Sequence, residues 1–138
     1  MRIMAIDYGD QRIGLAVSDL LGMLCGEAWT MNEWDMERAS KRIAEEAAAR
    51  EVGTLVLGLP KNMDGSEGGS ADKIRAFAEL LRPLTAAEIV FFDERVTTMA
   101  AHQILNLTDT RGAKRKSVVD TLSAEIILQN YLDREKNT

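Results

Sequence analysis

The sequence MRIMAIDYGDQRIGLAVSD, residues 1–19, contains the first two strands of the predicted fold. Its pattern of apolar residues predicts one strand over residues 2–7 and a second over residues 13–18. Gly9 lies in the short connection between them, where a tight turn is expected. The sequence therefore predicts that the chain begins with a β-hairpin.

Asp7 stands at the end of the first of these strands. Side chains alternate along a strand, so Asp7 shares a face with Ile3 and Ala5, and the opposite face is apolar too. A strand that is apolar on both faces is typical of the centre of a sheet covered on both sides. A carboxylate there needs a charged, hydrogen-bonding or metal partner, because isolating it from water costs several kcal/mol.

Length, composition and charge limit the class of protein. We expect residues 1–138 to form a single domain around one core, without a membrane span or a signal peptide. The lone Cys25 cannot form an internal disulfide, which favours a reducing, cytoplasmic location, and with a lone His102 it leaves no Cys/His zinc cluster. The net charge of −5 argues against a sequence-blind coat on nucleic acid, but allows an enzyme that contacts phosphates locally.

Beyond the hairpin, helices and strands alternate. The pattern predicts strands over residues 28–31, 54–57 and 88–93, and helices over residues 35–53, 70–83, 97–107 and 117–134. Asp35 and Ser70 are the expected caps of the first two helices, and residues 61–69 and 108–116 are expected to be loops. The order predicts an α/β fold, a mixed five-stranded sheet flanked by helices on both faces, with the first strand central and the last helix packed over it.

Two further acids are placed where they can meet Asp7. Glu94 directly follows the strand at residues 88–93, and the C-terminal ends of parallel strands share one edge of a sheet. Around the axis of the last helix, Asp120 lies within about 40° of the apolar stripe formed by Ala124, Ile127 and Tyr131. This position directs Asp120 toward the sheet. Three acids of this kind suit a hard divalent cation such as Mg²⁺, which can position a water and neutralise charge on a phosphodiester.

Each of the two acids also has a structural interpretation. Glu94 can pair with Arg95, or simply end its strand in solvent. Asp120 ends the sequence SVVD, which begins at Ser117 and has the spacing of a capping box, so it can serve the helix dipole instead. Spacing alone leaves both interpretations of Asp120 open.

Four segments then resemble the signature blocks of one family. They are IDYGDQRIGLAVSD, VLGLPKNMDGSEG, DERVTT and KRKSVVDTLSAEIILQNYLD, and they span nearly the whole chain. The chain is similar to the YqgF family, RuvX-type Holliday junction resolvases of ribonuclease H-like fold that are also described as pre-16S ribosomal RNA nucleases. The resemblance implies that Asp7, Glu94 and Asp120 are metal-binding catalytic acids, with Mg²⁺ or Mn²⁺ as cofactor. A fourth acid or a histidine is not obvious, because Ser117 and Ser123 occupy the nearby helix positions.

Basic residues offer contacts to a phosphate backbone. Arg12 can contact phosphate or neutralise a buried acid, and a cluster ahead of the last helix can grip phosphates, although it can equally be a solvated loop. The cluster consists of Arg111, Lys114, Arg115 and Lys116. Trp29 and Trp34 are too few for a base-stacking platform, and we interpret both as packing residues.

The first hypothesis is a metal-dependent nuclease in rRNA processing and ribosome biogenesis, or in Holliday junction resolution, acting on precursor rRNA or branched DNA. The alternative is a non-catalytic nucleic-acid-binding factor in ribosome maturation or transcription. A weaker third hypothesis, a phosphate-binding domain of the actin and sugar-kinase kind, requires paired lobes for which the chain is too short. Both a monomer and a homodimer are compatible with the sequence, although symmetric cleavage of a junction favours a two-fold dimer. No membrane partner is expected.

Overall fold

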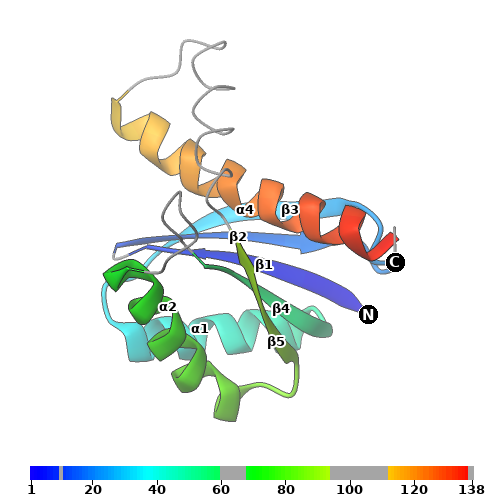
Figure 1. Ribbon diagram of the computed structural model, residues 1–138, viewed down its shortest axis with the longest axis horizontal. Helices are drawn as coiled ribbons and strands as arrows, with labels where there is room; N and C mark the ends of the chain where they lie inside the picture. Colours follow the sequence, from blue (N-terminus) through cyan, green and yellow to red (C-terminus); the bar gives the residue numbers. More distant parts are fainter. Residues whose placement is uncertain (10, 60–67, 94–111, 137–138) are drawn as a thin grey trace.

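The computed structural model describes residues 1–9, 11–59, 68–93 and 112–136, with backbone alone at residues 112–120 and 136. A five-stranded sheet of order β3-β2-β1-β4-β5 lies at its centre (Figure 1). The strands are β1 (Arg2–Tyr8), β2 (Arg12–Ser18), β3 (Cys25–Asn32), β4 (Val52–Leu59) and β5 (Glu88–Asp93). The helices are α1 (Met36–Ala49), α2 (Gly69–Leu81) and α4 (Gly112–Lys136), and a 3-10 turn, η1 (Arg82–Leu84), follows α2.

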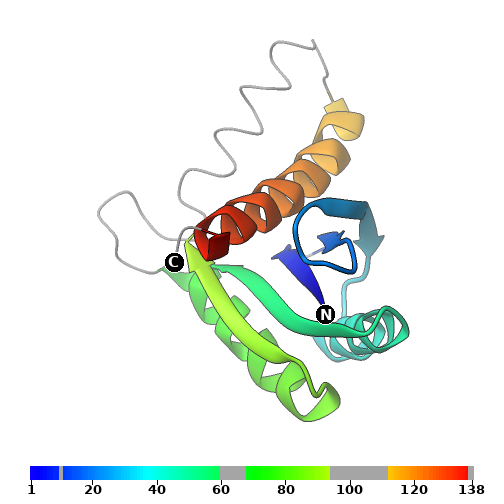
Figure 2. The same cartoon turned by 90° about the vertical axis from the view of Figure 1, so that its right-hand side faces the viewer.

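The sheet is mixed, and β1 is its middle strand. β1 pairs antiparallel with β2 and parallel with β4, while β3 and β5 form the two edges. Helices α1 and α2 cover one face and α4 covers the other (Figures 1 and 2). The predicted α/β fold is therefore confirmed, including the central first strand and the last helix packed over it. None of the helices in the described ranges is long and apolar enough to cross a membrane.

The two faces of the sheet carry different cores. Large side chains such as Ile6, Leu57 and Phe77 fill the space beneath α1 and α2, and each contributes roughly 1.5–3 kcal/mol when fully buried. The α4 face is built from smaller residues, among them Ala5 and Ala16, which allow the helix to lie close to the strands. The alternation predicted along β1 is confirmed, and it places Asp7 on the α4 face.

The end of α1 differs from the prediction. The Asp35 cap is confirmed, since its carboxylate accepts a hydrogen bond from the Glu37 N–H at 3.0 Å. The helix ends at Ala49 rather than at Gly53, because Glu51 takes the left-handed conformation (φ 55°) that a glycine usually supplies. Gly53 lies instead in β4, where a Cβ would come within 2.9 Å of the Met1 sulfur.

The first residues of α2 and α4 also differ from the prediction. α2 is capped by Gly68 rather than Ser70. α4 begins at Gly112, so residues 112–116 are helical rather than loop, and Asp120 lies in the helix interior rather than in the first turn. The capping-box interpretation of Ser117 is therefore wrong, because the preceding lysines and arginine are good helix formers and extend the helix. The predicted helix at residues 97–107 lies outside the described residues.

The β1–β2 connection brings two backbone segments into close contact. A Cβ on Gly9 would lie 2.6 Å from the Arg12 carbonyl oxygen, a distance that only movement of the turn can relieve. On the other side, the Gln11 carbonyl accepts a hydrogen bond from the Glu33 N–H at 3.1 Å. The β1–β2 turn is therefore constrained by close contact within the hairpin and by a hydrogen bond to Glu33, the residue after β3.

We predict that Gly9→Ala lowers the free energy of unfolding by about 1–3 kcal/mol, because the clash is with backbone. Gly69→Ala is the matched control: a Cβ there meets nothing within 4 Å, and it should be neutral or stabilise by about 0.5–1 kcal/mol. Urea denaturation of both variants measures the difference. Equal stabilities would show that Gly9 is not required by packing.

Candidate active site at the edge of the sheet

Asp7 belongs to a row of residues that crosses the sheet. It lies opposite Gly14 of β2, and Gly14 in turn lies opposite Thr30 of β3. Directly opposed residues share a face, so all three lie beneath α4. Gly14 carries no side chain, so the residue of β2 directly opposite the half-buried Asp7 contributes only backbone.

A side-chain hydrogen bond joins helix α4 to Thr30, the residue of this row that lies on β3. The hydroxyl of Thr30 and the hydroxyl of Thr121 share a hydrogen bond of 2.5 Å. Thr121 directly follows Asp120 in the chain, so the contact fixes this turn of α4 against the row that contains Asp7. One turn later, Ala124 packs among Ala5 and Ala16.

The strand ends meet as expected for parallel strands. Ile6 of β1 aligns with Leu57 of β4, and Leu59 of β4 aligns with Asp93 of β5. The C-terminal ends of β1, β4 and β5 therefore share one edge of the sheet. Glu94, the next residue after β5, lies outside the described residues.

The other predicted site residues are only partly described. Asp120 lies on the described backbone of α4, but its side chain lies outside the described part. Lys114, Arg115 and Lys116 likewise lie on the first turns of α4, and Arg111 is outside the described residues. Arg12 is half-buried at the start of β2, opposite Asn32 at the end of β3.

Ser123 carries a buried hydroxyl without a partner. The residue is 0% exposed, and its Oγ makes no hydrogen bond to any described group. On a helix, positions 121 and 123 are separated by about 160° around the axis. Because Thr121 contacts β3, Ser123 lies on the flank of α4 that faces away from β3, and an unpaired buried hydroxyl on this flank can accept or donate one further bond.

The available donors fit a hard divalent cation. Carboxylate oxygens are ligands that such ions take, and Asp7 lies on the same face of β1 as Ala5, which packs under α4. Within the described ranges no three potential His, Cys, Asp or Glu ligands gather. A complete ligand set must therefore draw on residues outside those ranges or on the side chain at position 120.

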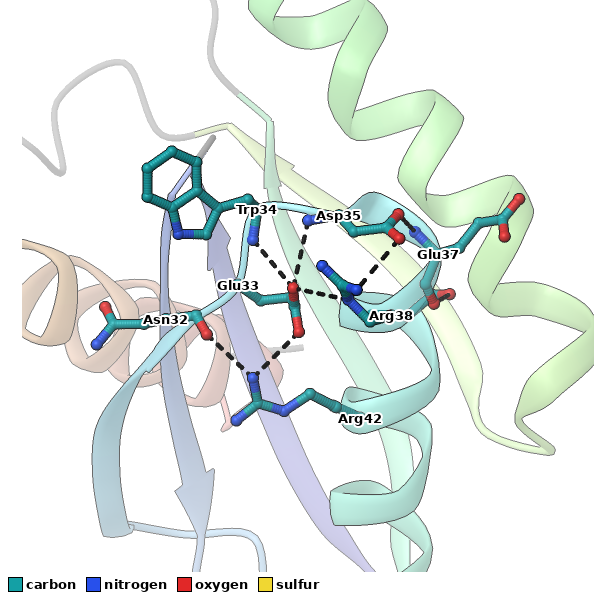
Figure 3. A network of polar contacts seen from close by, with 8 residues as sticks. Asn32, Glu33, Trp34, Asp35, Glu37, Arg38 and Arg42 are labelled. Atoms are coloured by element: carbon teal, nitrogen blue, oxygen red, sulfur yellow. Dashed lines mark hydrogen bonds and ion pairs between the residues drawn. The ribbon is translucent and has the colours of Figure 1, made fainter.

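A charged network that the sequence analysis missed lies beside this edge, in the link from β3 to α1 (Figure 3). The Glu33 carboxylate, 11% exposed, accepts hydrogen bonds from the N–H groups of Trp34 and Asp35 and from the guanidinium groups of Arg38 and Arg42. Burial alone would raise the pKa of Glu33, but the bonds from Asp35 and Arg38 hold it below its ordinary value. The sequence feature that could have indicated this network is an acid, Glu33, two residues before the helix cap, followed by Arg38 and Arg42 one turn apart on the helix.

The two tryptophans differ in their surroundings. Trp29 packs against the core beneath α1, and the guanidinium of Arg50 lies 4.4 Å from its ring centroid, so its interpretation as a packing residue is confirmed. Trp34 is 74% exposed, so the same interpretation of Trp34 is wrong. Its position next to the helix cap keeps the indole outside the core.

Comparisons with known proteins agree on one family. The family model for the RuvX Holliday junction resolvase matches residues 1–134. A protein of Halalkalibacterium halodurans named "Putative pre-16S rRNA nuclease" is 44% identical over 138 residues, covering 99% of both chains. A protein of the same name from Thermoanaerobacter pseudethanolicus is 42% identical, again over 99% of both chains.

Solved structures support the fold. Thermus thermophilus RuvC bound to a Holliday junction superposes with a TM-score of 0.60 at 13% identity, covering 100% of this chain and 97% of that chain. The fowlpox virus resolvase in complex with junction DNA gives 0.59 at 10% identity, covering 98% and 99%. At these identities the likeness concerns the fold, which is that of RuvC-like, ribonuclease H-like resolvases.

We predict that Thr30→Val and Thr121→Val each cost about 1 kcal/mol of unfolding free energy, because each removes the hydrogen bond between the two hydroxyls. The double variant should cost little more than one single change. Denaturant unfolding of the four proteins gives the coupling energy. Fully additive losses would mean that the two hydroxyls do not interact.

We also predict that Ser123→Ala raises the free energy of unfolding by about 1–3 kcal/mol in metal-free buffer with EDTA, because an unpaired buried hydroxyl is removed. Ser40→Ala is the matched control in α1: it gains the same helix propensity, but it loses the 2.7 Å hydrogen bond to the Glu37 carbonyl. Ser40→Ala should therefore be the less stable variant of the two. The opposite order would show that Ser123 has a partner after all.

Proposed function

Because the chain belongs to the RuvX family of Holliday junction resolvases, we infer that it is a nuclease that hydrolyses phosphodiester bonds in structured nucleic acid. The observation that carries the inference furthest is the place of Asp7. It ends the middle strand of a resolvase-like sheet, on the face covered by α4, at the edge where three parallel strands end. Such strand ends are where sites form in open α/β sheets.

We assign the metal-binding role to Asp7, Glu94 and Asp120, which also form the catalytic set. The support is positional: β5 ends at the same edge and Glu94 is the next residue in the chain, while Asp120 directly precedes Thr121, which contacts the Asp7 row. The ion is divalent, and Mg²⁺ or Mn²⁺ suits an all-oxygen ligand set. When bound, such an ion acidifies a water and neutralises charge that develops on the phosphodiester.

The chain's own residues then bind and orient the substrate. The scissile phosphate approaches Asp7 at the edge of the sheet where β1 ends. Arg12 on the hairpin side and the cluster of Arg111, Lys114, Arg115 and Lys116 on the α4 side contact the phosphate backbone on either side of it. The partial burial of Asp7 strengthens its electrostatic interactions relative to those in water.

We propose 5′-end maturation of pre-16S rRNA as the physiological reaction, in the cytoplasm, with branched DNA as a second substrate. The support for RNA is the name carried by relatives that are more than 40% identical over nearly their whole length. The support for branched DNA is the family description and the junction-bound structural neighbours.

We predict that Asp7→Asn, Glu94→Gln and Asp120→Asn each lower the cleavage rate at least about 100-fold with Mg²⁺ present, because each removes a proposed metal ligand. Asp133→Asn is the matched control, an exposed acid on α4 that is hydrogen-bonded to Gln129, and should cut normally. The assay follows a labelled rRNA precursor and a labelled four-way DNA junction on denaturing gels.

If all three variants cleave as fast as the wild-type protein, the assigned site is wrong. Salt-sensitive binding of either substrate without turnover by the wild-type protein would favour a non-catalytic binding factor instead. In that case, replacing Lys114, Arg115 and Lys116 by Gln should weaken binding, whereas Asp7→Asn should not.

A further inference from the structure

Trp34 exposes a large aromatic surface that folding does not require. Its relative exposure is 74%, while the adjoining helix is capped by Asp35. A residue in this position often packs against the fourth helical residue as a hydrophobic staple, which here would be Ala39. Ala39 is buried against the core, and the indole points away from the Glu33 network instead (Figure 3).

The backbone that carries this indole is held in place. The Trp34 N–H donates to the Glu33 carboxylate at 3.1 Å, and the same carboxylate is held by Arg38 and Arg42. The Arg42 guanidinium also donates to the Asn32 carbonyl at 3.0 Å, and the Glu33 N–H donates to the Gln11 carbonyl. The exposed ring therefore stands on a segment tied to both α1 and the β1–β2 turn, which lowers the entropy lost when a partner binds it.

The indole lies within reach of the proposed active site. Thr30 is in the same row as Asp7, two strand spacings of about 4.8 Å away. Trp34 follows Thr30 by four residues, which span at most roughly 13 Å when extended. A nucleic acid strand with a phosphate at Asp7 can therefore place a base on Trp34 within a few nucleotides.

A cation lies between the two points. Arg12 is on β2, two residues before Gly14 on the same face of the sheet as Asp7, and it lies opposite Asn32 at the end of β3. Arg38 is paired with the Glu33 and Asp35 carboxylates, so these acids are neutralised beside Trp34. An aromatic ring beside guanidinium groups is the combination that binds single-stranded nucleic acid, through stacking on the base and contacts to the phosphates. A site for a protein partner would need a contiguous apolar patch around Trp34, and its immediate neighbours are charged.

We propose that Trp34 stacks on an unpaired base of the nucleic acid substrate and so selects substrates with a single-stranded or distorted segment beside the cleaved bond. This inference rests on the proposed nuclease function, and it adds a binding subsite to it. Arg12 contacts the phosphates between the stacked base and Asp7. The subsite lies beside the β1–β2 hairpin, at the edge of the sheet where β3 ends.

Fluorescence tests the stacking directly, because the chain has only two tryptophans. Trp29→Phe leaves Trp34 as the sole emitter, and Trp34→Phe leaves Trp29. The probe is an RNA hairpin with a single-stranded 5′ extension, titrated in EDTA so that no cleavage occurs, with a blunt RNA duplex of the same length as the comparison. We expect saturable quenching of Trp34 by the extended hairpin, little quenching by the blunt duplex, and unchanged emission from Trp29.

Affinity measurements by anisotropy of labelled RNA complete the test. Trp34→Ala should weaken binding of the extended hairpin roughly 5- to 150-fold, the range expected for one base stacked on an aromatic side chain, while Trp34→Tyr should retain most of the affinity. Leu21→Ala, a change at an 81% exposed residue in the β2–β3 connection, is the control and should bind normally.

The outcomes separate this inference from the proposed function. Binding with unchanged Trp34 emission, or equal affinity of Trp34→Ala and the wild-type protein, overturns the stacking subsite but leaves the nuclease function standing. Equal quenching by the blunt duplex overturns the selectivity for unpaired bases. Absence of any binding to either RNA overturns the stacking subsite, while cleavage of the rRNA precursor and of the four-way DNA junction with Mg²⁺ separately decides the nuclease function.

Discussion

The rest of the structure depends on a carboxylate that ends the middle strand of the sheet. Asp7 lies near the end of β1, a strand packed on both faces, and burial at that position is favourable only when the carboxylate has polar or ionic partners. The hairpin sets Gly14 opposite Asp7, and the parallel neighbours bring their own C-terminal ends to the same edge. A sheet with this strand order therefore creates the site by the same pairing that creates its core.

Helix α4 connects the core to this edge. Its apolar stripe packs on the small residues Ala5 and Ala16, and only a short distance between helix and sheet allows the Thr30 and Thr121 hydroxyls to meet at 2.5 Å. On the other flank of the same helix, Ser123 is buried without a hydrogen-bond partner among the described groups. A polar atom left unsatisfied in an otherwise well-packed layer is the kind of local cost that functional sites carry.

Much of this arrangement could be predicted from local patterns. The alternation of side chains along β1 correctly predicted which face of the sheet Asp7 lies on. The apolar stripe from Ala124 to Tyr131 correctly predicted which side of α4 is buried. Local patterns did not predict where two of the helices begin or end. Helix α1 ends earlier than predicted, because Glu51 adopts a left-handed conformation in place of a glycine. Helix α4 begins earlier than predicted, because basic residues extend it back to Gly112. The Glu33 network and the exposure of Trp34 depend on how β3 meets α1, which residue spacing does not reveal.

The most direct measurement is a crystal structure of the protein soaked with Mn²⁺, with anomalous scattering used to locate the ion. The account predicts that Mn²⁺ is coordinated by carboxylate oxygens of Asp7, Glu94 and Asp120 together, on the α4 side of the edge. An ion bound elsewhere, or three carboxylates too far apart to share it, would contradict the assignment of the active site.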